Sequence, residues 1–481
     1  MSGATSSSMG RSLSAKVTDR LQDICGRSFA RLAGAADEVA GQLGHWVAAP
    51  GDVSAATEVL RLAAECELSV VPRGAGTKID WGSTPARVDI VLDTGRLAGF
   101  GHHRENPSEI EVGAGTPFRS IQDRLARSGQ RLSFDPPSTG AGATLGGVLA
   151  AGEAGPLRLR YGGPADQVTE LRHLNPDGVL RVVRTDVGGP GRGARRSRPT
   201  TTNLPPDVRV DSAWANADTG GWPTDAGEQM GLLCGSNGGL GLVVQATLRT
   251  QPLPETRIYV ARPVANPLEV SDLVGEVRAA DVGESAIELD LAGGAELSQF
   301  VNAEHPSVAG RSALGAGSLV VLVEGERADV DDRVRRLRRV LGGRVTTSSG
   351  APRWWGRYPF GTGDVVLRIE AEPRHLSSAM YAFVDHLRTP VPIRGSVAAG
   401  VVHAVLPSPF VAAERVVSVV EVLRRLLLLR EGTCVVVAAP AGIRELVDLW
   451  GGLPGLSRLG EIKERIDPAR RLAPGRLPGG H

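Results

Sequence analysis

The sequence predicts an α+β protein with two domains, and three observations lead to this prediction. With 481 residues the chain is too long for one ordinary hydrophobic core. Short apolar strands alternate with helical segments along both halves. Three glycine-rich runs follow strands in the first half, whereas the composition changes near residue 255. We therefore expect a first domain in which the glycine-rich runs let the backbone approach other groups closely, and a second domain built on a separate sheet.

The chain is expected to begin with a disordered leader over 1–15 and a helical N-terminal extension over 16–44. The first domain starts at residue 45. Asp52 precedes an amphipathic helix, and its carboxylate suits the N-cap position. A strand at 68–71 follows this helix and leads directly into the first glycine-rich run.

This run, Pro72-Arg-Gly-Ala-Gly-Thr-Lys78, predicts a turn that cradles phosphate. Without bulky side chains the backbone can approach a pyrophosphate, and successive N–H groups can converge on its oxygens. The chain has no G-x-x-x-x-G-K-[ST] string and no G-x-G-x-x-G that opens a helix, so neither a Walker loop nor a Rossmann site is predicted.

Two further runs make the pattern specific. The second contains Ala143-Thr-Leu-Gly-Gly147, and the third is Gly235-Ser-Asn-Gly-Gly-Leu-Gly-Leu-Val243. In this order the three runs resemble the PCMH-type (vanillyl-alcohol oxidase-like) FAD-binding domain, whose members carry P-R-G-[GA]-G-T, A-T-x-G-G and G-S-x-G-x-L-G-[ILV]. Within that family the chain is most similar to the FAD-binding subunit of glycolate oxidase, over 46–183 and 231–254.

The resemblance implies that the first domain, 45–254, binds FAD. The binding is expected to be non-covalent, because Thr77 stands where members with histidyl flavin carry a His. The residues that the resemblance assigns to the cofactor are Pro72, Arg73, Gly74, Ala75, Gly76, Thr77, Pro137, Gly142, Ala143, Thr144, Gly146, Gly147, Tyr161, Asp166, Gly238, Leu240 and Val243.

The chain departs from the family at two places. Ala165 replaces the basic residue that usually precedes Asp166, so this carboxylate is expected to lack its ion-pair partner. Residues 186–229 replace a V-K-N-x-x-G-Y-D-L run and are rich in Gly, Pro, Thr and Arg, which predicts a mobile insertion. It is read as a tolerated surface insertion, as a docking loop for a redox partner, or as an eroded part of the flavin wall.

The second domain, 255–454, reads as one antiparallel sheet with helices on one face. Strands are expected at 318–324, 364–370, 396–406 and 433–438, and helices at about 328–341, 373–388 and 411–430. The resemblance implies that this unit is a cap over the flavin that shapes the substrate pocket. It also implies that the C-terminal segment, 455–481, returns to the FAD-binding domain.

Composition excludes several other classes. The 54 Lys and Arg residues balance 53 Asp and Glu residues, so no nucleic acid is expected as partner. No apolar stretch is long enough for a membrane span, and no apolar leader is present. We expect a cytoplasmic protein, with peripheral attachment to a membrane through partners left open. The four cysteines form no C-x-x-C, and neither an iron–sulfur cluster nor any other metal site is predicted.

Oxidation of a hydroxy acid on a flavin requires a base for the hydroxyl proton and a cation for the carboxylate. In the cap the candidates put forward for the site are His403, Arg394 and Tyr358, chosen from a set that also contains Arg368 and Arg353. For His403, which lies in an apolar strand, a structural role is an equally good interpretation.

Three functions follow from these observations. The first is an FAD-linked oxidoreductase similar to the glycolate oxidase subunit. It would act on a 2-hydroxy acid or alcohol together with a second flavoprotein subunit and an iron–sulfur subunit. The second is a self-sufficient FAD oxidase or dehydrogenase. The third is a non-catalytic scaffold that keeps the fold but has lost flavin chemistry.

Overall fold

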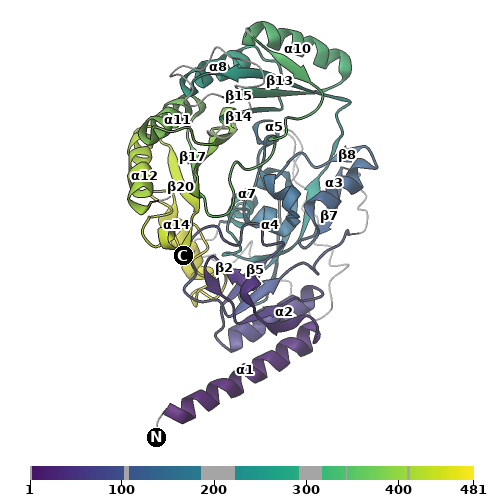
Figure 1. The fold of residues 1–481 in the computed structure, drawn as a ribbon. Helices are drawn as coiled ribbons and strands as arrows, with labels where there is room; N and C mark the ends of the chain where they lie inside the picture. The colour runs from purple at the N-terminus through teal and green to yellow at the C-terminus, as the bar shows by residue number, and fades with distance from the viewer. Residues whose placement is uncertain (1–2, 102–107, 186–222, 292–316, 343, 409–411) are drawn as a thin grey trace.

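A computed structural model describes residues 3–101, 108–185, 223–291, 317–342, 344–408 and 412–481, with only the backbone helix described before residue 14. The predicted insertion therefore lies outside the described residues as far as 222, and its last residues enter helix α7 (Ala226–Leu233). Figure 1 shows the first half of the chain below and to the right, and the large sheet with its helices above and to the left.

The first small sheet carries the turn of the first glycine-rich run. Its strand order is β1-β4-β6-β5, and β4, β6 and β5 are parallel. Helix α2 (Val53–Glu65) covers it, and Asp52 caps this helix as predicted, accepting a hydrogen bond from the Ala55 amide at 2.8 Å. The strands are β1 (Ala30–Leu32), β4 (Trp46–Ala48), β5 (Val70–Arg73) and β6 (Ile90–Asp93).

The expected helical extension over 16–44 is wrong beyond Cys25. Helix α1 runs from Gly3 to Cys25, so it also includes most of the expected leader. Gly26, at φ +92°, ends the helix, and the chain then forms β1, a short 3₁₀ turn (Ala35–Asp37) and the hairpin of β2 (Glu38–Val39) and β3 (Gln42–Leu43). These strands have only two or three residues each, too few to show an alternating pattern in the sequence.

A second small sheet has the order β10-β9-β11-β7, with every neighbour antiparallel. An Asn-Pro-Asp-Gly turn joins β9 and β10 in a hairpin, where Asn175 Oδ1 accepts from the Val179 amide at 2.8 Å. Helices α3 (Phe118–Ala126) and α4 (Leu145–Ala150) pack on this sheet in one apolar core. The strands are β7 (Glu109–Gly113), β9 (Val168–Leu174), β10 (Leu180–Arg184) and β11 (Leu242–Arg249).

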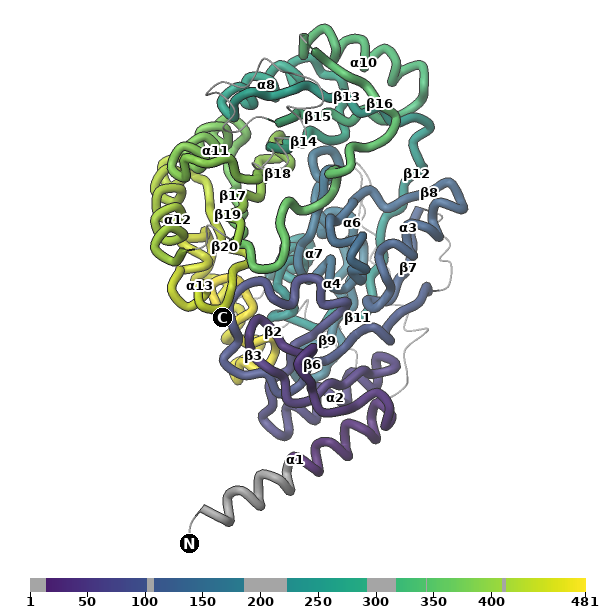
Figure 2. The backbone as a smooth tube through the Cα atoms, viewed as in Figure 1, coloured from purple at the N-terminus to yellow at the C-terminus, as the bar shows by residue number. Residues whose placement is uncertain are grey.

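The second half of the chain forms the predicted antiparallel sheet. It has eight strands in the order β16-β13-β15-β14-β18-β19-β17-β20. They are β13 (Thr256–Val264), β14 (Ala286–Leu291), β15 (Gly317–Gly325), β16 (Thr346–Ser348), β17 (Val365–Glu370), β18 (Ile393–Ser396), β19 (Val401–Leu406) and β20 (Thr433–Ala438). Helices α8 (Val270–Ala279), α10 (Arg327–Leu341), α11 (Pro373–Leu387) and α12 (Ala413–Leu428) cover one face (Figure 2).

Side chains alternate between the two faces of a strand, so the residues in the core determine which residues lie on the face of the sheet that the helices do not cover. In β14, Ile287, Leu289 and Leu291 pack in the core beneath the helices. Glu288 and Asp290 therefore point to the opposite face. The same alternation places Arg368 of β17 and His403 of β19 on that face, which is the one turned toward the first half of the chain.

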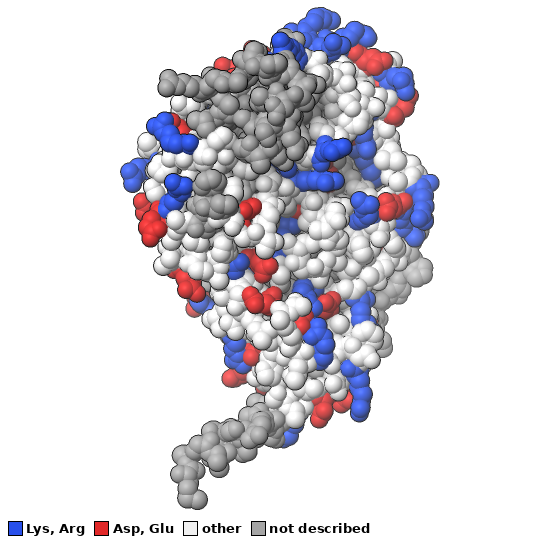
Figure 3. Space-filling model, in the orientation of Figure 1, with Lys and Arg blue, Asp and Glu red and all other residues white. Residues whose placement is uncertain are grey.

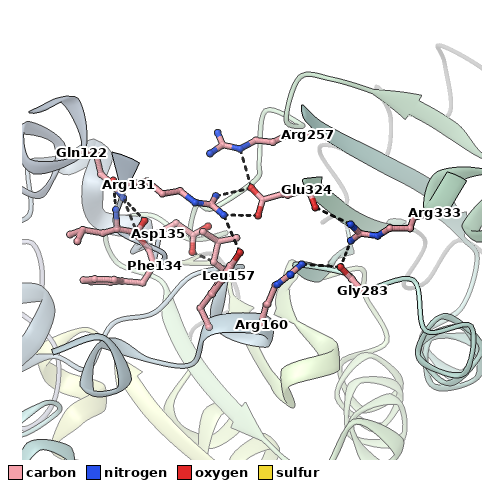
Figure 4. Close-up of polar contacts among 12 residues, drawn as sticks. Gln122, Arg131, Phe134, Asp135, Leu157, Arg160, Arg257, Gly283, Glu324 and Arg333 are labelled. Atoms are coloured by element: carbon pink, nitrogen blue, oxygen red, sulfur yellow. Dashed lines mark hydrogen bonds and ion pairs between the residues drawn. The ribbon is translucent and has the colours of Figure 1, made fainter. Parts of the chain in front are cut away.

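An ion-pair cluster joins the two halves (Figure 4). Arg131, in β8 (Gln130–Arg131), donates to both carboxylate oxygens of Glu324 in β15, at 2.7 and 3.0 Å. Arg257 Nε donates to the same carboxylate at 3.0 Å. Burial raises the pKa of Glu324, but the two guanidinium groups outweigh burial and leave it lowered. The second half is thus held to the first by a desolvated carboxylate with two cations.

The last segment returns to the first sheet. Helix α14 (Leu456–Ile466) is followed by residues that pair with β5, where the Val70 amide donates to the Arg471 carbonyl and the Ala473 amide to the Val70 carbonyl, each at 2.7 Å. Elsewhere on the surface, basic and acidic side chains are interspersed over the face in Figure 3. Within the described residues, no helix has the length and apolar character needed to cross a membrane.

Candidate functional site

The three glycine-rich runs meet at one cavity of about 70 Å³, which we call the glycine cavity. Strand β5 ends at its rim, and the N-terminus of α4 faces it. The structure brings these residues together from segments far apart in the sequence: Pro72, Arg73, Gly74, Ala75, Gly76, Thr77, Lys78, Ile79, Thr144, Gly147, Ala150, Ala151, Asn237 and Arg476.

The local geometry of this cavity depends on its glycines. Gly76 has φ +73°, a conformation that L side chains rarely adopt. A Cβ at Gly74 would lie 2.2 Å from Thr144 Oγ1, so the first and second runs touch through bare backbone. Thr144 caps α4 by accepting from the Gly147 amide. The cavity is therefore lined mainly by backbone and small side chains, as a pyrophosphate site requires.

Arg73 contributes its backbone to the turn, while its charge is used elsewhere. Its guanidinium pairs with Asp37 at 2.8 Å and with Asp93 at 2.9 Å. Hydrogen bonds from Arg31 lower the pKa of Asp37, burial opposes this, and the bonds from the Gly34 amide and Arg73 lower it further. Arg73 thus fixes β5 to its neighbours and leaves no free charge for a phosphate.

The other residues assigned to the cofactor lie around the cavity rather than in it. Gly146 allows close packing, since a Cβ there would lie 2.8 Å from Ala114 Cβ. Gly238, at φ +79°, packs in the same way against Pro72. The remaining ones form supports: Gly142 is a left-handed cap, Ala143, Leu240 and Val243 are buried in the core, and Pro137 lines a separate small cavity.

Tyr161 and Asp166 also have structural partners. The Tyr161 hydroxyl accepts from Arg131 at 3.1 Å, beside the ion-pair cluster. Asp166 Oδ2 accepts from the Gly163 amide at 2.7 Å at the start of helix α6 (Pro164–Gln167). The Asp166 carboxylate, which was expected to lack its ion-pair partner, therefore has a backbone amide as its hydrogen-bond donor.

A second cavity, of about 360 Å³, lies between the two halves, and we call it the large cavity. It shares Lys78, Ala151 and Asn237 with the glycine cavity, so the two are adjacent. Its polar lining comes from both halves of the chain: Lys78, Glu153 and Arg158 from the first, and Tyr358, Arg368, Glu370, His403 and Thr433 from the second.

Glu153 organises the polar wall of the large cavity. This buried carboxylate accepts from the Tyr358 hydroxyl at 2.9 Å and from the Ser138 amide at 3.0 Å, and it forms an ion pair with Lys78. Burial lowers the pKa of Lys78, although Glu153 opposes the effect. Burial and the Glu153 charge raise the pKa of Tyr358 well above 10, so this phenol stays protonated and acts as a donor.

Two of the three catalytic candidates come together here. The rings of His403 and Tyr358 meet edge to face, with centroids 5.1 Å apart. Burial lowers the pKa of His403 to about 3, and the charges of Arg368, Arg158 and Lys78 act in the same direction, so the imidazole is neutral. His403 packs against Tyr358, which is a structural role, and its ring also lines the cavity, where it can contact a substrate.

Arg394, the third candidate, lies in an adjoining small cavity of about 40 Å³. It is already paired, because its Nε donates to Asp290 Oδ1 at 2.6 Å. The cross-strand register explains the pair, since Asp290 stands opposite Arg394, Arg394 opposite His403, and His403 opposite Arg368. Arg394 is therefore held in the sheet.

Sequence reasoning missed Lys78, Glu153 and Arg158. A signal for the first was present, because the chain has only three lysines and one of them directly follows the phosphate-type turn. Glu153 and Arg158 follow the second glycine-rich run, but nothing in the sequence shows that they face the large eight-stranded sheet, which we also call the cap sheet. Among the described residues, no group of three or more His, Cys, Asp or Glu side chains could hold a metal ion.

Comparison with known proteins identifies the class. Residues 45–184 match the model of the FAD binding domain, and this segment carries the first two glycine-rich runs and the strands around them. The chain thus contains an FAD-binding domain of PCMH type, and FAD is its cofactor. Since the residues of the glycine cavity fit a pyrophosphate, geometry and family model agree.

Individual relatives are enzymes. D-lactate dehydrogenase of Archaeoglobus fulgidus is 26% identical over 231 residues, which is 48% of this chain and 44% of that protein. D-2-hydroxyglutarate dehydrogenase of Xanthomonas citri is 25% identical over 215 residues, 44% of this chain and 38% of that protein. Alkyldihydroxyacetonephosphate synthase of Trypanosoma brucei brucei is 27% identical over 217 residues, which is 44% of this chain and 29% of that protein. The aligned parts span less than half of each relative.

The fold as a whole also has a solved counterpart. A structure of alkyldihydroxyacetonephosphate synthase superposes with a TM-score of 0.59 over 89% of this chain and 77% of that one, at 14% identity. This likeness covers both the FAD-binding domain and the region of the large sheet, and it establishes the fold.

Proposed function

We propose that this protein is an FAD-dependent oxidoreductase that oxidises a 2-hydroxy acid or alcohol and passes the electrons to a separate acceptor, as the FAD-binding subunit of glycolate oxidase would. The observation that carries this proposal is the contact between two cavities. The glycine cavity adjoins the polar large cavity, and the two share Lys78, Ala151 and Asn237 in their linings. Bound FAD supplies a hydride acceptor. The hydroxy-acid dehydrogenases among the relatives support the substrate class.

In this proposal the chain's own residues bind and orient the substrate. Neutral His403 accepts the hydrogen bond of the substrate hydroxyl, and its low pKa, about 3, makes it a hydrogen-bond acceptor rather than a strong base. The protonated Tyr358 is fixed by Glu153 and forms the adjoining wall. Trp81 and Trp450 add apolar surface to the lining of the cavity.

The proposal is tested on the purified protein. We expect it to be yellow, and we expect anaerobic addition of D-lactate, glycolate or 2-hydroxyglutarate to bleach the flavin. Colourless protein that takes up no added FAD would support the scaffold interpretation. Bleaching followed by rapid reoxidation in air, without any partner, would identify a self-sufficient oxidase and remove the separate acceptor.

Non-covalent attachment is tested separately. Acid precipitation should release all the flavin into the supernatant, since Thr77 at the first turn offers no nucleophile comparable to an imidazole. Colour retained in the washed pellet would contradict this. The second flavoprotein subunit and the iron–sulfur subunit remain part of the proposal, and co-purification from the native host is their test.

A further inference from the structure

The cations that line the large cavity and the small cavity differ in their partners, and one of them, Arg357, is exposed to solvent. Lys78 pairs with Glu153, Arg368 with Glu370, and Arg394 with Asp290. Arg158, in helix α5 (Arg158–Tyr161), is different. Within the described part of the chain no carboxylate lies at ion-pair distance from it, and its hydrogen bond is Nη2 to the Ala154 carbonyl at 2.9 Å.

A carboxyl group near Arg158 does not neutralise it. Glu288 is buried on the facing side of β14 and accepts a hydrogen bond from the Ser396 hydroxyl. Burial raises the pKa of Glu288 to about 8, so this group is uncharged at neutral pH. Arg158 therefore brings a positive charge without a directly paired carboxylate into a partly enclosed site, which is unfavourable unless an anion binds there.

The position of Arg158 shows where that anion would lie. Its side chain lines both the large cavity and the small cavity, together with Tyr358 and His403. It does not line the glycine cavity, so it is not placed for a pyrophosphate. Burial lowers the pKa of Arg158 and the nearby charge of Arg368 lowers it further, whereas Glu288 and Glu370 oppose both effects. Two guanidinium groups thus approach the same space.

We propose that Arg158 is the anion anchor of this site, that its guanidinium binds the carboxylate of the substrate, and that the substrate is consequently an acid and not a neutral alcohol. That the bound anion is a substrate rests on the proposed function. The anion site itself is inferred from Arg158 and its surroundings, without any catalytic step. A planar guanidinium can donate two parallel hydrogen bonds to a carboxylate. Arg394, the cation favoured by the sequence, cannot replace it while it is bound to Asp290.

The test measures binding of oxalate, a carboxylate that the flavin does not oxidise, to the holoprotein. Tryptophan fluorescence reports binding, because Trp81 and Trp450 line the large cavity. We expect Arg158→Gln to weaken oxalate binding by about tenfold or more, and Arg158→Lys to retain part of it. The matched control is Arg160→Gln, an exposed neighbour on the same helix with the same change in charge. It should bind oxalate as the parent protein does.

The outcomes separate the anchor from the oxidoreductase proposal. Unchanged oxalate affinity in Arg158→Gln, or no oxalate binding to the parent protein, would overturn the anchor. Tighter binding of inorganic phosphate than of oxalate would overturn the carboxylate assignment. If a neutral alcohol bleached the flavin equally well in the parent protein and in Arg158→Gln, the claim that the substrate is an acid would be overturned. The oxidoreductase proposal would then still stand. Arg158-dependent oxalate binding without bleaching by any hydroxy acid would support the anchor and remove the proposed reaction.

Discussion

At the scale of single residues, Glu153 links the two halves of the molecule. It belongs to the segment after the second glycine-rich run, and it binds Lys78 and Ser138 on its own side and Tyr358 on the other. Its side chain is 1% exposed. A buried carboxylate is stable only where charge and hydrogen bonds replace water, and four donor groups from three residues do this here.

Glu153→Gln should therefore destabilise the protein. The amide keeps the shape of the side chain but leaves the Lys78 ammonium buried without a counter-ion, which costs about 3 kcal/mol or more. Urea denaturation of the holoprotein measures the loss. Glu464→Gln, at an exposed site on α14, is the control and should change the free energy of unfolding little. Equal stability of both variants would show that Lys78 is not buried against Glu153.

Glu288 makes stability depend on pH in a definite direction. Its folded pKa, about 8, is above its ordinary value of 4.5, so the folded state binds the proton more tightly. Its contribution is present below about pH 4.5 and is lost as pH rises through about 8. Glu288→Gln should flatten the loss of thermal stability between about pH 5 and about pH 8. Glu421→Gln, exposed on α12, should not, and an unchanged slope in Glu288→Gln would contradict the assignment.

At the scale of elements, the strand that ends in the first glycine-rich run depends on one unusual backbone conformation. Gly76→Val forces a β-branched residue to φ +73°, which costs roughly 1–3 kcal/mol. We expect FAD content to fall sharply while the overall fold survives, and absorbance together with circular dichroism measures both. Gly129→Val, at φ +69° and outside the glycine cavity, is the control and should keep its FAD. Full flavin occupancy in Gly76→Val would place the pyrophosphate elsewhere.

The C-terminal segment contributes one more cation to the glycine cavity. Arg476 is 6% exposed, donates Nη2 to the Lys78 carbonyl at 3.2 Å, and has no hydrogen-bond partner for Nη1 among the described residues. Burial lowers the pKa of Arg476 to about 10, and Arg444 contributes. Arg476→Gln should weaken FAD binding about tenfold and riboflavin binding hardly at all, because riboflavin lacks phosphate. Equal losses for both ligands would contradict a phosphate contact.

Elements with long, regular patterns could be predicted from the sequence. Helices α10, α11 and α12 and the strands between them repeat apolar residues at the spacing that the large sheet requires. The strands before residue 48 could not be predicted, since they are short and separated by Gly26 and Gly41 at positive φ. The glycine cavity was predictable because its residues are adjacent in three short runs. Arg158 was not, because its role arises only where α5 meets the cap sheet.

At the scale of the whole molecule, the ion-pair cluster of Figure 4 decides how firmly the cap sheet is held. Arg131 and Glu324 are almost fully buried, with 7% and 3% of their side chains exposed. A buried pair contributes little compared with an apolar pair, but removal of one partner is expensive.

Glu324→Gln should consequently destabilise the protein by about 3–5 kcal/mol, since Arg131 and Arg257 then lose their shared counter-charge. The double variant Arg131→Met, Glu324→Leu should recover part of this loss, because the buried Arg131 charge is removed together with its partner and Arg257, 42% exposed, stays in contact with water. Free energies of unfolding for the parent and both variants decide the matter. A double variant no more stable than the single one would show that the cluster does more than neutralise charge.

The pairing of Val70 with residues 471–473 has a consequence for biosynthesis. In the order of its sheet, β5 is an edge strand, and the returning segment covers that edge. A ribosome makes β5 some four hundred residues before the segment that covers it. Until then the strand that leads to the phosphate-type turn has an unpaired side, a form that invites association with other chains. Cofactor loading is thus expected to follow completion of the chain, and a nascent first half is expected to associate through this edge more readily than the finished protein.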